Sequence, residues 1–98
     1  MGMETRVPLA GGIPPWPRVL EEAGSPPLEM RMIDGELSFP DEMPPETWHE
    51  LRVARAGIML TIRRAENAVL LVGWGTGDPA QVALTEALVA AFQRAAGM

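Results

Sequence analysis

The chain has 98 residues, a formal net charge of −5, no cysteine and a single histidine. This length accommodates one small domain. The acidic balance disfavours nucleic-acid binding, which needs a basic footprint, and the lack of cysteine excludes disulfides, thiolate catalysis and sulfur-ligated zinc. No apolar run suits a membrane span, and the N-terminus does not read as a signal peptide. We therefore expect a cytoplasmic protein with no membrane or nucleic-acid partner, no metal and no cofactor.

Residues 1–27 are rich in proline and glycine, and we expect them to form a partly ordered arm in front of a single α+β domain of residues 28–98. Proline fixes φ and donates no backbone hydrogen bond, which confines regular structure to short stretches. Residues 18–23 are compatible with one or two helical turns. Trp16 and its aliphatic neighbours give the arm an apolar face, so we expect it to dock on the core or on a partner.

The dipeptide Asp34-Gly35 predicts a β-hairpin, because a two-residue type I′ turn needs a positive φ at both central positions. The alternation of apolar and polar residues on either side agrees with a single register. The pairs that this register predicts are Met32 with Leu37 and Met30 with Phe39.

Residues 46–56 allow two interpretations. A strand is favoured, because Leu51 and Val53 then share one face, whereas on a helix arginines would interrupt the apolar stripe. Residues 57–64 alternate as a strand, and residues 69–74 form an apolar strand of the kind buried in a sheet. We expect an antiparallel meander of four to five strands with a C-terminal helix on one face. If residues 46–56 are helical, the order becomes ββαββα.

The C-terminal helix is predicted to begin at Asp78-Pro79 and to end near Ala96, since aspartate caps free N–H groups and proline suits the first helical position. Its apolar stripe is widened by Val82 and Val89 beyond what one sheet face requires. The surplus predicts a second contact, with the arm or with another copy. The candidate interaction residues are Trp16, Val82, Val89 and Phe92.

Residues 68–78 resemble, over about a dozen positions, the first motif of the class I S-adenosylmethionine-dependent methyltransferases: an apolar strand, three alternate glycines and a helix. The resemblance implies a nucleotide or phosphate group held at the helix N-terminus. The candidate ligand-binding residues are Gly73, Trp74, Gly75 and Gly77. The sequence departs from the pattern at Leu71, where that family usually has an acidic residue. In addition, fewer residues follow the motif than the rest of that fold needs.

We expect that the protein is not an enzyme and has no catalytic residues. His49 and Glu50 are adjacent, but neighbouring residues of a strand point to opposite faces. The leading hypothesis is a non-catalytic protein-interaction or assembly module, either a homo-oligomer or a subunit of a larger complex. The alternative is a small nucleotide- or phosphate-binding domain that uses the loop from Gly73 to Asp78. A regulatory partner-binding protein is a third possibility. The arginines expected on the polar sheet face are Arg31, Arg52, Arg63 and Arg64.

Overall fold

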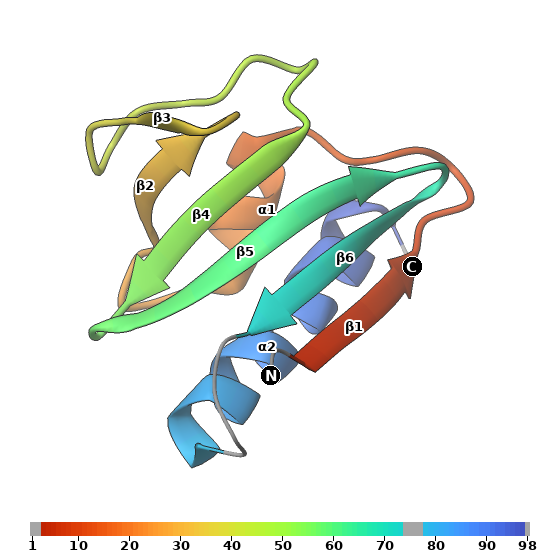
Figure 1. Ribbon diagram of the computed structural model, residues 1–98. Coiled ribbons are helices and arrows are strands. Elements are labelled where there is room, and N and C mark those ends of the chain that lie inside the picture. Colours follow the sequence, from red (N-terminus) through yellow and green to blue (C-terminus); the bar gives the residue numbers. More distant parts are fainter. Residues whose placement is uncertain (1–2, 74–77, 98) are drawn as a thin grey trace.

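The computed structural model describes residues 3–73 and 78–97, which form a six-stranded antiparallel sheet with two helices on one face (Figure 1). The elements in chain order are β1 (Met3–Pro8), α1 (Trp16–Ala23), β2 (Glu29–Ile33), β3 (Glu36–Leu37), β4 (Glu50–Arg55), β5 (Ile58–Ala65), β6 (Ala68–Gly73) and α2 (Pro79–Ala95). The strand order across the sheet is β1-β6-β5-β4-β2-β3. The α+β class with a C-terminal helix on an antiparallel sheet is confirmed, but the expected count of four to five strands is wrong.

The additional strand is β1, which pairs antiparallel with β6, so that Thr5 lies opposite Leu71. The proline-rich arm expected for residues 1–27 is not confirmed, because this region contributes β1 to the sheet and α1 to the helical layer. Trp16 is buried, with its ring 6.4 Å from the ring of Phe92 on α2. The β1–β6 pairing joins residues 3–8 to residues 68–73, and no local sequence pattern reports such a contact.

The hairpin turn forms as predicted, with φ of 49° at Asp34 and 83° at Gly35. Met32 pairs with Leu37, as expected. The second predicted pair, Met30 with Phe39, does not form: the Met30 N–H donates instead to the carbonyl oxygen of Pro40 at 2.9 Å. Strand β3 therefore ends after two residues. The prediction missed this break because the alternation of polar and apolar residues continues through residues 38 and 39.

Residues 50–55 form strand β4, which confirms the favoured interpretation of that segment and removes the ββαββα alternative. Strands β4, β5 and β6 are joined by short turns as a meander, whereas β2 lies between β3 and β4. No helix within the described ranges is long and apolar enough to cross a bilayer.

The core lies between the sheet and the helices, and both helices lie behind the sheet in Figure 1. Helix α2 begins as predicted, with the Asp78 carboxylate accepting a hydrogen bond from the backbone N–H of Ala80 at 2.9 Å. The core side chains of α2 are Leu84, Leu88, Ala91 and Phe92. The larger side chains from the sheet and its connections are Val7, Leu9, Met30, Trp48, Leu51, Val53, Leu60, Ile62, Val69 and Leu71.

Candidate interaction surface

An apolar groove of about 200 Å³ runs between edge strand β1 and helix α2. Its exposed apolar side chains include Met3, which is 55% exposed, and Val82, which is 38% exposed. Val89 lies one heptad after Val82 and lines the same groove. The lining residues are Met3, Thr5, Gly73, Gln81, Val82, Thr85, Glu86 and Val89. We call this surface the β1–α2 groove.

The helix sequence explains why the groove is apolar. Leu84 and Leu88 are buried against the sheet, and Val82 and Val89 are displaced around the helix toward its β1 flank. A helix on a sheet needs one apolar stripe. Val89 is half-buried and also packs against the core, whereas Val82 remains exposed. The predicted surplus of apolar arc on α2 therefore lies beside an edge strand.

Gly73, at the end of β6, faces the side chain of Gln81 on α2. A Cβ added at this position would lie 2.7 Å from Nε2 of Gln81 and 3.1 Å from Cδ of the same side chain. An added Cβ would therefore meet the flexible end of the Gln81 side chain, which lines the β1–α2 groove, and this contact does not by itself require glycine.

Strand β1 forms one edge of the sheet. Among the described residues it pairs with β6 alone, and its outward side has no neighbouring strand. An unpaired strand edge is a template for another strand. The groove and the free edge are therefore adjacent parts of one surface.

The four candidate interaction residues divide into two pairs in the structure. Val82 and Val89 line the β1–α2 groove. Trp16 and Phe92 are both buried, 4% and 0% exposed, and contact each other in the core. A partner could reach the first pair without unfolding the protein, but not the second.

The glycine motif is described only at its two ends, because Trp74, Gly75 and Gly77 lie outside the described residues. At one end, Gly73 faces Gln81. At the other, the Asp78 carboxylate accepts from the Ala80 N–H and so takes up one of the free donors at the start of α2. An incoming anion would meet the negative charge of Asp78 at this helix terminus.

A second cavity, of about 260 Å³, lies next to Trp48 and Arg64. The guanidinium of Arg64 stacks over the Trp48 ring at 4.7 Å and donates a hydrogen bond to the carbonyl oxygen of Glu46 at 2.8 Å. The expectation that Arg64 shares the polar sheet face with Arg63 is therefore wrong. Adjacent strand residues point to opposite faces, and only Arg63 pairs on the other face, with Glu50 at 2.9 Å. The Arg64 guanidinium thus has partners within the chain, while its buried Nε has none among the described residues.

His49 and Glu50 supply backbone groups rather than an acid–base pair. One carboxylate oxygen of Asp34 accepts hydrogen bonds from the backbone N–H groups of His49 at 2.7 Å and Glu50 at 2.9 Å. These two bonds stabilise the ionised carboxylate and hold the pKa of Asp34 below its usual value of 3.8. The contact ties the hairpin turn to the start of β4. The Glu50 side chain is engaged by Arg63.

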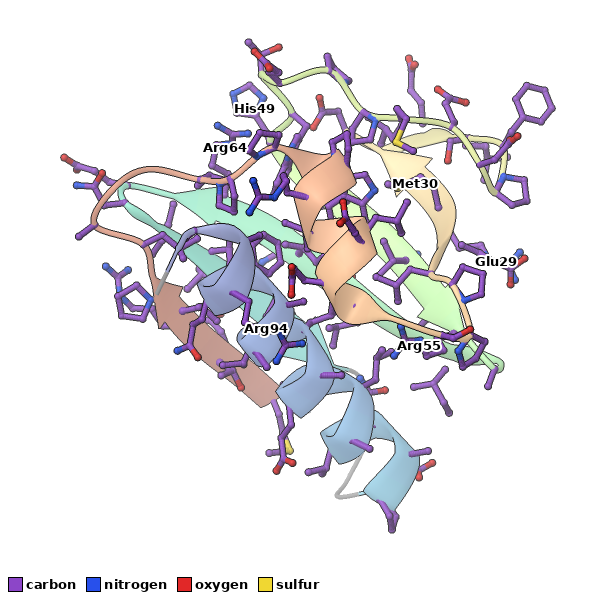
Figure 2. All side chains as sticks on the ribbon, turned by 180° about the vertical axis from the view of Figure 1, so that it is seen from behind. Glu29, Met30, His49, Arg55, Arg64 and Arg94 are labelled. Carbon is purple, nitrogen blue, oxygen red and sulfur yellow. The ribbon has the colours of Figure 1, made fainter. Side chains whose placement is uncertain are left out.

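Two arginines hold the C-terminal end of α1, and Figure 2 shows both beside this helix. Arg55, at the end of β4, donates to the carbonyl oxygens of Ala23 at 2.6 Å and Gly24 at 3.3 Å. Arg94, on α2, donates to the Glu22 carbonyl oxygen at 2.9 Å and forms an ion pair with the Glu22 carboxylate at 3.0 Å. Cations at a helix C-terminus satisfy free carbonyls and complement the helix dipole.

The residues of β1 were not expected at this surface: Met3 and Thr5 line the groove, and Glu4 and Arg6 alternate with them along the strand. Their alternation of apolar and charged side chains up to Pro8 was the available signal, because proline is accepted on an edge strand. The proline content of residues 1–27 as a whole outweighed that signal.

Comparison with protein-family models, curated proteins and solved structures finds no match for this chain. Within residues 3–73 and 78–97, no three histidine or acidic side chains gather as metal ligands would.

Proposed function

We propose that this protein is a non-catalytic interaction module whose binding surface is the β1–α2 groove and the adjoining edge of β1. The observation that carries the proposal is the coincidence of an unpaired strand edge with an apolar groove lined by Met3, Val82 and Val89. Each feature alone is common on protein surfaces. Together they match the strand-addition mode of recognition, in which the edge supplies backbone hydrogen bonds and the groove accepts side chains.

The energetic argument rests on the apolar side chains of the groove. Met3 and Val82 keep about half and more than a third of their surface exposed. Fully burying a side chain of this size contributes roughly 1.5–3 kcal/mol, so covering the groove offsets part of the entropic cost of association. Replacement of the exposed Met3 or Val82 should leave folding largely intact, whereas replacement of Val89, which also packs against the core, should cost some stability.

The proposal is tested by placing charge in the groove. Val82→Glu combined with Val89→Glu should abolish self-association, measured as molar mass by light scattering across a concentration series. The matched control is Ala80→Glu combined with Ala83→Glu, which adds the same charge to exposed positions of the same helix outside this groove. The control should keep the mass of the unmodified protein.

Circular dichroism and a urea titration on all three proteins separate lost association from lost folding. If the unmodified protein associates and the folded Val82/Val89 variant has the same mass at every concentration, the proposal is contradicted.

A further inference from the structure

We infer that the partner of this surface is a second copy of the same chain, added antiparallel along β1 with Thr5 on the two-fold axis. The inference rests on the interaction role proposed above and specifies its partner and its register. It is carried by the hydrogen-bonding direction of β1 and by the order of its charges.

The outward backbone groups of β1 belong to its even-numbered residues. The N–H of Leu9 donates to the carbonyl oxygen of Asn67 at 2.6 Å, which continues the β1–β6 ladder. In an antiparallel ladder the groups that face one neighbour recur at every second residue, so the odd-numbered residues of β1 face β6. Glu4, Arg6 and Pro8 then face outward. Pro8 has no N–H to leave unpaired at this edge.

The side chains of β1 follow a pattern that is self-complementary about Thr5. In an antiparallel pair centred there, Glu4 of each copy lies opposite Arg6 of the other, and Met3 lies opposite Val7. Glu4 and Arg6 also carry the outward N–H and C=O groups, so each opposed pair can exchange both backbone hydrogen bonds. The same residues thus satisfy the ladder and place opposite charges side by side, as a two-fold contact requires.

In the two neighbouring symmetric registers, the residue pairs that exchange backbone hydrogen bonds no longer carry opposite charges. Shifting the centre of symmetry to Glu4 places that carboxylate opposite its own copy, and shifting it to Arg6 does the same for the guanidinium. Like charges directly opposite each other destabilise a strand pair. The second shift also sets Glu4 opposite Pro8, which donates no hydrogen bond. Of these three symmetric registers, the one centred on Thr5 alone sets opposite charges against each other.

The two-fold axis of such a pair is perpendicular to the joined sheet, so both copies keep their helices on the same side. The β1–α2 groove of each copy then meets that of the other across the axis, with Met3, Val82 and Val89 on both sides. The edge and the groove are covered by one partner, which explains why they lie together.

A cysteine placed on the axis tests the register directly. Opposed residues that do not exchange hydrogen bonds have Cα atoms about 4.5 Å apart, within the range of a disulfide. The chain has no cysteine of its own, so Thr5→Cys should form a covalent dimer on mild oxidation. Met3→Cys is the matched control, because the two copies of residue 3 lie roughly 13 Å apart along the strand pair and should not cross-link.

Charge reversal tests the pairing of Glu4 with Arg6. Glu4→Arg alone and Arg6→Glu alone should each weaken dimerisation about tenfold, because each reversal turns both symmetric pairs repulsive. The double variant restores opposite charges and should recover the affinity of the unmodified protein. Mixing the two single variants should give heterodimers in preference to either homodimer.

The outcomes separate this inference from the proposed function. A dimer that depends on Val82 and Val89, but in which Thr5→Cys does not cross-link and the double charge reversal does not restore affinity, overturns the β1 register and leaves the groove as the interaction surface. A monomer at every concentration for the unmodified protein overturns self-association itself. Cross-linking of Thr5→Cys but not Met3→Cys, together with rescue by the double reversal, supports the inference.

Discussion

At the β3 end of the sheet the edge strand has two residues and a loop with three prolines follows it, whereas at the β1 end the edge strand has six residues and an apolar groove runs beside it. Short edge strands and prolines are ways in which proteins prevent strand addition. The β3 end has both. The β1 end has Pro8 and two charges, and in the proposed dimer these charges pair with those of the second copy.

The two ends also differ in how their helices are held. Helix α1 receives hydrogen bonds at its C-terminal end from Arg55 and Arg94, which join it to β4 and α2. Helix α2 is capped by its own Asp78, and its flank toward β1 carries Val82 and Val89. Polar contacts within the chain thus complete the α1 side, while Val82 on the α2 side remains an exposed apolar side chain. The comparison predicts that substitutions on the α1 side lower stability and that those on the α2 side lower association.

The largest loss of stability is expected for Arg55→Met. The substitution removes the cation that caps α1 and leaves the Ala23 carbonyl without its donor. Hydrogen bonds to charged groups contribute roughly 1.5–3 kcal/mol. We expect about 1.5 kcal/mol, the lower end of that range, because Nε of Arg55 is buried without a partner among the described residues and its removal relieves some cost. Urea titration gives the free energy of unfolding.

The control for this prediction is Arg94→Met, whose partner atoms on Glu22 lie nearer the solvent. Exposed ion pairs contribute about 0.2–1 kcal/mol, so the loss should be smaller than for Arg55→Met. Both variants should keep the molar mass of the unmodified protein. A change of mass in either would mean that the two sides of the molecule are not independent.

A pH-dependent effect is expected at the hairpin. The lowered pKa of Asp34 means that its contribution to stability is fully present above the usual value of 3.8 and is lost as the pH falls through the folded-state pKa. Asp34→Asn keeps an acceptor oxygen and tolerates the positive φ, but it removes the charge. The variant should have a lower urea midpoint than the unmodified protein near neutral pH, and the difference should shrink in acid below that value. An equal difference at both pH values would contradict the assignment.

The sequence predicted the elements whose signals are local. The Asp34-Gly35 turn, the Asp78 cap and the strand from residue 50 to 55 each depend on neighbouring residues, and each is confirmed. The burial of Trp16 against Phe92 depends instead on contacts between distant parts of the chain, which a single sequence does not display.

For the candidate site, too, the sequence identified only the residues whose signal is local. The helical periodicity of α2 identified Val82 and Val89, because their excess over one stripe is visible locally. It could not identify the neighbour of this flank, since β1 reaches α2 through its pairing with β6. The opposite charges of Glu4 and Arg6, on either side of Thr5, suggest strand pairing with a second copy only when β1 is known to be an edge strand.

The smallest effect is expected at the β3 end, where Leu37 is 87% exposed and Phe39 is 74% exposed. Their exposed surface exceeds that of Val82, so an argument from exposure alone would place the partner here. Strand β3, however, has only two residues. After β3 ends, the Met30 N–H donates to the carbonyl oxygen of Pro40. Few backbone groups near Leu37 and Phe39 are therefore free to pair with another strand. Leu37→Ser with Phe39→Ser should leave the molar mass unchanged and alter the free energy of unfolding by no more than about 0.5 kcal/mol. If light scattering instead showed that this pair lowers the mass while the charged groove variant does not, the partner would bind at the β3 end, and hydrophobic exposure would outweigh edge geometry in this fold.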